Sequence, residues 1–186
     1  MGIDPGLDGG IALIDGEGKV VLLSVMPTLL TGKGGKRTLN IVALRKILLG
    51  NVEFVGDFEP ADLICLERQQ PYPSQGGVSN FTTGLGYGIL LALIEGVWPL
   101  EIVGPKAWQK FYGIAGGEGQ DVKAQALLVG RGLYPNIDFR ATPRCKKAHS
   151  GLVDALLIAR YGLSRHPAAQ VEAKLAAAGP LKEAEE

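Results

Sequence analysis

Short apolar runs separated by a compact polar turn open the chain and predict a β-meander. Residues 10–14 and 20–25 are almost wholly apolar, and the sequence Asp-Gly-Glu-Gly at 15–18 joins them. Such a turn between two β-prone runs is typical of a hairpin. A shorter apolar run leads into Asp4, so the first part of the chain predicts three strands joined by tight turns.

Beyond residue 40, helical and strand-like patterns alternate. Apolar residues recur every three or four positions within 40–49, which predicts an amphipathic helix. The elements predicted after it are a strand at 63–66, a helix capped by Ser79 or Asn80 and ending near 94, a strand at 100–103, a helical turn from Pro105, and helices at 120–130 and 152–161. The glycine-rich segments at 27–38 and 70–77 are predicted to be loops, the first of them mobile.

This order of elements predicts a single α/β domain over residues 1–165. Its mixed five-stranded sheet combines an antiparallel meander with parallel strands that are reached through helices, and helices flank the sheet. Residues 166–186 are rich in alanine and charge, so we expect a helical or frayed tail there. No internal repeat and no domain linker interrupts the pattern.

Composition places the chain among globular proteins. Of its 186 residues, 46% are hydrophobic and 20% are charged, which excludes a disordered protein. No run is apolar over the roughly 18 residues that span a bilayer, and no leader precedes the first motif, so we expect a cytoplasmic protein without a membrane partner. Cys65 and Cys145 fit that compartment as buried free thiols.

The net charge is zero, but the cations are unevenly distributed. Residues 33–46 and 140–147 each contain several lysines and arginines and no acid. Such stretches could face the phosphates of a nucleic acid. Scattered solubilising charge is an equally good interpretation of either stretch alone.

Three carboxylates stand at positions that suit metal chemistry. Asp4 ends a strand and is followed by glycines, Glu67 ends the strand at 63–66, and Asp154 begins an apolar helix whose free N–H groups favour an acid. Converging carboxylates bind Mg²⁺ or Mn²⁺ through oxygen. Each residue alone also has an ordinary interpretation, as a turn acid, the first polar residue of a loop, or a helix N-terminal acid.

The motifs GIDPGLDGGIALID, LICLE and HSGLVDALLIARYG, in this order, resemble those of the RuvC-type Holliday junction resolvases, particularly the phage and RuvC-like branch of the RNase H superfamily. The resemblance extends to about Gly162. It implies an RNase H-like fold, a homodimer, and paired hydrolysis of four-way junction DNA by two Mg²⁺ or Mn²⁺ ions per active site, with no nucleotide cofactor.

By position, the resemblance implies that Asp4, Glu67 and Asp154 are metal-binding catalytic carboxylates. His149 or Ser150 stands where a fourth ligand is expected. Many members of the family read His-Asp-Gly there, whereas this chain reads His149-Ser150-Gly151. His149 is therefore our candidate for the fourth catalytic ligand, and a weakened metal site is the alternative.

Polar residues around these motifs are candidates for contacts with DNA. Tyr72 could stack on an unpaired base or simply pack in its loop. One of Lys106, Lys110, Lys123 and Lys147 could offset transition-state charge, and the sequence does not choose among them. The full candidate set is Lys33, Lys36, Arg37, Arg68, Gln69, Tyr72, Lys106, Lys110, Lys123, Lys146 and Lys147.

Gly84, Gly86 and Gly88 fall within one predicted helix, where each glycine costs up to about 1 kcal/mol. Close approach of another backbone would explain them. That backbone belongs either to a two-fold mate or to the protein's own sheet.

Three other functions compete with a junction resolvase. An ATP-using phosphotransferase of the actin and sugar-kinase type also places an Asp-x-Gly turn after a strand, but it needs two related domains with a second phosphate loop. A junction-binding module with a decayed metal site is kept open by His149-Ser150. Another structure-selective nuclease of the RNase H type would use the same carboxylates.

Overall fold

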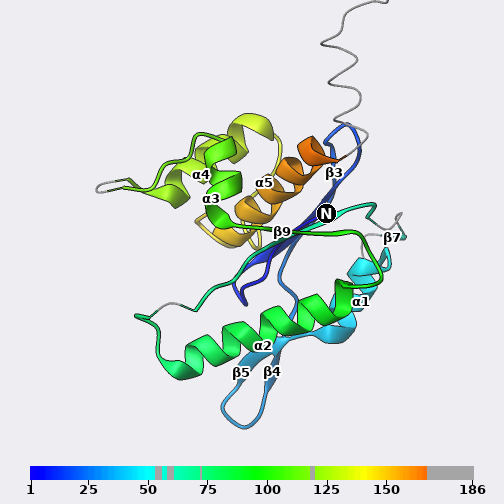
Figure 1. The fold of residues 1–186 in the computed structure, drawn as a ribbon, viewed down its shortest axis with the longest axis vertical. Helices are drawn as coiled ribbons and strands as arrows, with labels where there is room; N and C mark the ends of the chain where they lie inside the picture. Colours follow the sequence, from blue (N-terminus) through cyan, green and yellow to red (C-terminus); the bar gives the residue numbers. More distant parts are fainter. Residues whose placement is uncertain (53–55, 58–60, 72, 118–119, 167–186) are drawn as a thin grey trace, which may run out of the picture.

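A five-stranded mixed sheet forms the centre of the molecule in a computed structural model, which describes residues 1–52, 56–57, 61–71, 73–117 and 120–166 (Figure 1). The strands lie in the order β3 (Val20–Val25), β2 (Gly10–Ile14), β1 (Gly2–Asp4), β8 (Ile64–Glu67) and β9 (Leu100–Val103). The first three are antiparallel, and β1, β8 and β9 are parallel. The mixed sheet predicted from the sequence is confirmed.

Helices cover both faces of this sheet, as Figure 1 shows. One face carries α3 (Pro105–Phe111), α4 (Val122–Leu133) and α5 (Ser150–Arg165), and the other carries α1 (Ile41–Leu48) and α2 (Gly77–Ile94). Alternate strand residues enter two hydrophobic clusters. Ile3 and Leu66 belong to the cluster of α1 and α2, whereas Cys65 belongs to the cluster of α5.

Glycines let α5 lie directly on the strands. A Cβ atom on Gly2 would lie 2.4 Å from the carbonyl oxygen of Ala155, and one on Gly10 would lie 2.4 Å from the carbonyl oxygen of Gly151. A Cβ atom on Gly162 would lie 2.4 Å from the Cys65 sulfur. Backbone therefore packs on backbone at the sheet's centre, which fixes the height of α5 above β1.

The prediction of a mobile loop at 27–38 is wrong. This segment forms a hairpin of β4 (Thr28–Thr31) and β5 (Lys36–Leu39), so only the tip at 32–35 is a turn. Its glycines suggested a loop, but they are confined to the tip, where Gly32 and Gly35 adopt positive φ. A second small hairpin, of β6 (Asn51–Val52) and β7 (Gly56–Asp57), was not predicted either.

Several predicted helix boundaries shift. Gly76 occupies the N-cap of α2, so neither Ser79 nor Asn80 caps it. The helix predicted at 152–161 runs from Ser150, which puts Asp154 in the second turn and removes the free N–H groups that were expected to stabilise its carboxylate. Asn40 caps α1 through a hydrogen bond from the Ala43 amide, and Asp121 caps α4.

Helix α2 spans 18 residues, because it begins at Gly77, before the predicted caps at Ser79 or Asn80. Within the described residues, it meets the length and composition of a membrane-crossing helix, although this criterion is also met by helices of soluble proteins. Cys65 is buried and Cys145 is half-buried, and both are free thiols. The tail predicted from residue 166 lies outside the described residues apart from His166.

Replacing Gly151 with alanine should destabilise the protein, because the new methyl group would lie 2.4 Å from the carbonyl oxygen of Asp8 and 2.5 Å from the carbonyl carbon of Gly9. Overpacking against backbone typically costs about 1–3 kcal/mol. Urea denaturation of Gly151→Ala measures this loss. Gly132→Ala in α4 is the control, since nothing lies within 4 Å of its new Cβ and helix propensity should hold or raise stability. Equal stability of the two variants would contradict the packing described.

Candidate metal centre

Parallel pairing of β1 with β8 brings two of the candidate carboxylates side by side. Ile3 lies opposite Leu66, so Asp4 and Glu67 follow at the same ends of neighbouring strands. Both side chains are only partly buried. A tight turn follows Asp4, in which the Gly9 amide donates to the Gly6 carbonyl at 2.8 Å. The Asp4 carboxylate therefore lies at the carboxyl-terminal end of β1, the central strand of the sheet.

Helix α5 supplies the third carboxylate. Its close contact with Gly2, at Ala155 and Ala159, holds the preceding residue, Asp154, above the end of β1. Asp154 is also partly buried. The structure thus brings Asp4, Glu67 and Asp154 into one electrostatic group, in which Asp4 and Asp154 act on Glu67 and Asp4 acts on Asp154.

The pKa values of Asp4, Glu67 and Asp154 are all raised above those of ordinary carboxyl groups. Burial, followed by repulsion from Asp4 and Asp154, raises the pKa of Glu67 to about 7. Burial and then repulsion from Asp4 raise the pKa of Asp154 to about 7, against the opposing charge of Lys123. Burial also raises the pKa of Asp4. Burial is thus the main cause at all three carboxyl groups, and the positive charge near them does not offset it.

His149 lies at the N-cap of α5, beside this group. Its backbone amide donates to the Phe139 carbonyl at 2.7 Å, which fixes the residue. Its charge opposes the rise in the pKa of Asp4 and adds to the lowering of the pKa of Asp8. The Nδ1 atom is buried and has no hydrogen-bond partner within the described structure. Ser150 is the first residue of the helix.

Trp108 is a site residue that the sequence analysis missed. Its indole Nε1 donates a 2.8 Å hydrogen bond to Oε1 of Glu67, and the side chain is buried. This bond partly offsets the rise in the Glu67 pKa. Trp108 lies on α3, outside the three carboxylate motifs, so its sequence pattern indicated only a core residue. A buried indole N–H that needs an acceptor was the available signal.

The donor set suits a hard divalent cation. Asp4, Glu67 and Asp154 offer only oxygen, and none of them forms an ion pair within the described residues. The unpartnered Nδ1 of His149 adds one nitrogen. Nowhere in the described chain do three or more acidic, histidine or cysteine side chains already lie in position to hold a metal. A cation would therefore have to draw these side chains together.

The candidate DNA contacts spread around this centre. Lys123, at the start of α4, acts electrostatically on Asp4, Asp8 and Asp154, which distinguishes it from the other three candidate lysines. Arg37 is already engaged by Asp8. Tyr72 lies outside the described residues. The remaining candidates, of which all but half-buried Gln69 are exposed, are Lys33, Lys36, Arg68, Gln69, Lys106, Lys110, Lys146 and Lys147.

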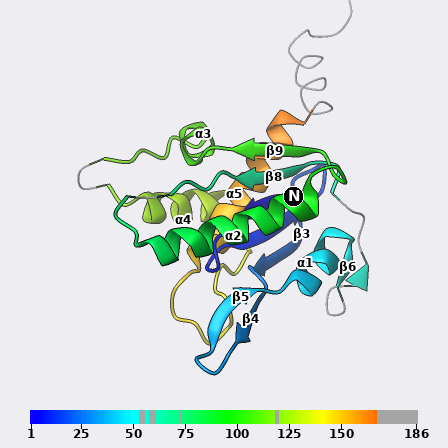
Figure 2. The same ribbon diagram turned by 60° about the horizontal axis from the view of Figure 1, so that its bottom comes forward.

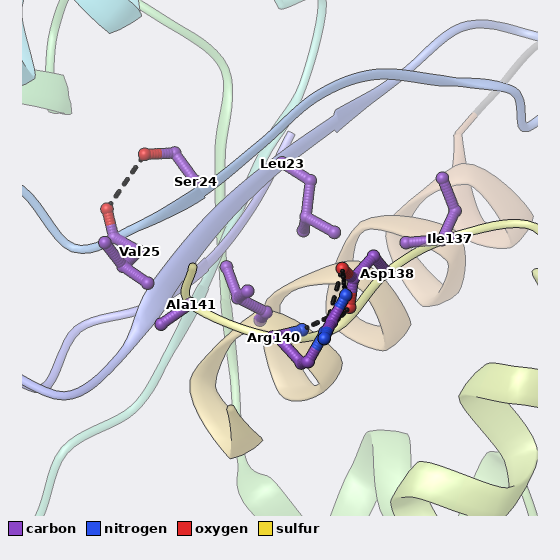
Figure 3. A pocket seen from close by; sticks show the side chains of 8 residues that line it. Leu23, Ser24, Val25, Ile137, Asp138, Arg140 and Ala141 are labelled. Atoms are coloured by element: carbon purple, nitrogen blue, oxygen red, sulfur yellow. Dashed lines mark hydrogen bonds and ion pairs between the residues drawn. The ribbon is translucent and has the colours of Figure 1, made fainter. Parts of the chain in front are cut away.

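A cavity of about 310 Å³ lies away from the carboxylates, between β3 and the segment before α5 (Figure 3). The residues that line it are Leu23, Ser24, Val25, Ile137, Asp138, Arg140, Ala141 and Leu152. Arg140, in the predicted basic stretch, is bound by Asp138 at 2.7 Å, so its charge is compensated locally. The cavity carries no group that completes the metal centre.

Without metal, the protein should lose stability as the pH rises from about 5 to 7. Between the ordinary carboxyl pKa values and about 7, the folded state binds more protons at Glu67 and Asp154 than the unfolded state does, so the free energy of unfolding falls with rising pH. Thermal unfolding in EDTA across this range measures the effect. Asp154→Asn should flatten the dependence, and Mn²⁺ at pH 8 should restore stability. A stability that rises with pH would contradict the mutual repulsion of these groups.

No family model and no curated protein matches the chain. Two solved structures of Thermus thermophilus RuvC are similar to it. RuvC in complex with Holliday junction substrate is 21% identical over 88% of this chain and 92% of that chain, with a TM-score of 0.49. A second Thermus thermophilus RuvC structure is 20% identical over 87% and 95% of the two chains, with a TM-score of 0.45. At these values the likeness is distant, and the function of the chain has to be judged from its carboxylate centre.

Proposed function

We propose that this chain is a divalent-metal-dependent endonuclease that cleaves four-way DNA junctions, a RuvC-like resolvase. One observation carries the proposal: β1, β8 and α5 carry three partly buried carboxyl groups, Asp4, Glu67 and Asp154, whose pKa values are raised by burial and, at Glu67 and Asp154, also by repulsion from neighbouring acids of the group. The sequence motifs around these residues, which resemble those of the resolvases, supply the substrate class. The basic surface residues suit a DNA backbone.

Within this proposal, Asp4, Glu67 and Asp154 hold Mg²⁺ or Mn²⁺ through their oxygens, and His149 offers Nδ1 as a further ligand. Bound metal supplies an activated water and stabilises the leaving oxygen in phosphodiester hydrolysis. Trp108 fixes Oε1 of Glu67, which limits rotation of that carboxylate and leaves Oε2 for the metal. Lys123 contributes positive charge beside the scissile phosphate, because it already acts on Asp4 and Asp154.

Asp4→Asn should abolish cleavage of a synthetic four-way junction while leaving junction binding largely intact. The substitution removes one metal-binding charge and keeps the shape of the side chain. Cleavage would be followed in Mg²⁺ and in Mn²⁺, with linear duplex, flap and RNA/DNA hybrid as competing substrates. Glu17→Gln, an exposed acid in the β2–β3 turn, is the matched control.

The competing functions give different results in the same assay. An active Asp4→Asn protein would remove Asp4 from the metal centre. Tight junction binding without cleavage by the unaltered protein in either metal would favour a non-catalytic junction-binding module, which His149-Ser150 keeps in consideration. Preferred cleavage of the hybrid or flap would favour another nuclease of the RNase H type, and measurable ATP binding would favour a phosphotransferase.

We also propose a homodimer formed through α2. Val78, Phe81 and Leu85 recur at helical spacing and are 76%, 70% and 52% exposed. A Cβ atom on Gly84 or Gly88 would meet nothing within 4 Å, and one on Gly86 would meet only the side chain of Leu39. Packing on the protein's own sheet therefore does not explain these glycines, whereas close approach of a second α2 does.

Phe81→Asp should convert this dimer to a monomer, because a charge at the centre of an apolar helix pair would be desolvated without a partner. Light scattering after size exclusion measures the mass. Leu128→Asp on α4 is the matched control, since Leu128 is 74% exposed and lies outside the α2 face. A monomeric unaltered protein, or a Phe81→Asp dimer, would refute the α2 interface.

A further inference from the structure

The β4–β5 hairpin is an arm that extends from the body of the domain (Figure 2). Its two strands pair from Thr28 with Leu39 at the base to Thr31 with Lys36 beside the tip. The tip, at 32–35, is closed by the Gly35 amide on the Gly32 carbonyl at 3.2 Å. None of the glycines at 32, 34 and 35 has another atom within 4 Å of a Cβ position, so the tip stands in open space.

The two faces of this arm carry different side chains. Side chains two apart on a strand share a face, so Arg37 lies on the face of Leu39, which is buried in the core. Lys36 lies on the opposite face, and Lys33 lies at the tip. Both lysines are exposed, and neither is ion-paired with a residue that the structure describes. No acid occurs between residues 27 and 46, so the arm carries a uniform positive charge.

Arg37 ties this arm to the turn after Asp4. One guanidinium nitrogen donates to Oδ1 of Asp8 at 2.6 Å, and the other donates to the carbonyl oxygen of Leu7. The hydrogen bond and charge of Arg37 lower the pKa of Asp8. The pair is exposed, with side-chain exposures of 42% and 85%, and such pairs contribute about 0–1 kcal/mol to global stability. Its effect is therefore local.

The turn to which Arg37 is hydrogen-bonded also contacts the start of α5, close to His149. The Asp8 carbonyl oxygen and Gly9 pack against the Cα position of Gly151, two residues after His149. The same turn is held to the end of β3 by the Met26 amide, which donates to the Gly9 carbonyl at 3.0 Å. Arg37 thus connects the arm to a turn that follows Asp4 on one side and contacts the start of α5 on the other.

We propose that the β4–β5 hairpin is a phosphate-binding arm for the DNA backbone and that Arg37 is the positioning residue that couples it to the metal centre. This inference rests on the proposed function, because it concerns the same site and the same partner. Lys33 and Lys36 bind backbone phosphates outside the centre. Arg37 holds the turn after Asp4 in place through Asp8 and Leu7 instead of binding DNA.

The lysines are tested by DNA binding in EDTA, where no cleavage is needed. Each of Lys33→Gln and Lys36→Gln should weaken binding to junction and linear duplex by the same factor, because phosphates carry no sequence or shape information. Each should also reduce the slope of log affinity against log salt by about 0.9. Lys19→Gln, at the far end of β2, is the control with the same loss of charge. An unchanged slope, or a loss no greater than that of Lys19→Gln, would refute the arm.

The coupling is tested by Arg37→Lys, which keeps the charge but loses the two-nitrogen grip. Junction affinity should be nearly retained, while the single-turnover cleavage rate at saturating protein falls on the order of 10-fold to 100-fold. Asp8→Ala should cause a similar fall, and the double variant should be no worse than either single one. Loss of affinity with an unchanged rate would make Arg37 a phosphate contact and refute the coupling.

Hydrogen exchange separates failure of this inference from failure of the proposed function. The Gly9 amide should exchange faster in Arg37→Lys than in the unaltered protein and should be unaffected by Lys36→Gln. An unaltered protein that never cleaves DNA would overturn the nuclease, whereas unchanged Gly9 exchange in Arg37→Lys would overturn the coupling.

Discussion

The contact of α5 with the centre of the sheet is the constraint on which the rest of the molecule depends. At Gly2, Gly10 and Gly151, backbone atoms of α5 lie directly against backbone atoms of β1, of β2 and of the turn after Asp4, with no side chain between them. A helix that rests on side chains lies about 10 Å from a sheet and can shift as those side chains repack. Contact between backbones leaves no such freedom. The glycine contacts therefore fix the height and register of α5 independently of its polar residues.

That rigidity explains how the protein tolerates its carboxylate centre. Burial raises the pKa of Asp4, Glu67 and Asp154, repulsion from neighbouring acids adds to the rise at Glu67 and Asp154, and the shifts oppose folding at neutral pH. Apolar contacts on both faces of the sheet offset this repulsion, since the largest buried side chains flank the strands that carry the acids. Raised carboxyl pKa values of this kind are typical of functional sites.

The same sheet leaves two elements facing outward. Helix α2 buries Leu90 and Ile94 against the strands but exposes the stripe of Val78, Phe81 and Leu85. The β4–β5 hairpin anchors Leu39 in the core and directs its lysines outward. Only Arg37 turns back, and it contacts the turn after Asp4. Through Arg37, the hairpin is therefore linked to the turn that follows β1.

The sequence by itself determined the sheet and the identity of its acids. Alternating apolar runs and tight turns predicted the meander, and the strand ends at Asp4 and Glu67 were placed correctly because local patterns decide them. Only the tertiary structure decided the rest. The hairpin at 28–39 was missed because glycines at its tip hid a pairing that only its two strands together stabilise. The sequence analysis explained Asp154 by the free N–H groups at a helix N-terminus. In the structure, its position follows from the packing of α5 on the sheet. The sequence around Trp108 did not show which acceptor its indole N–H would find, because that acceptor, Glu67, lies 41 positions away. Local patterns specify which residues end a strand, but contacts between distant segments specify which of those residues meet.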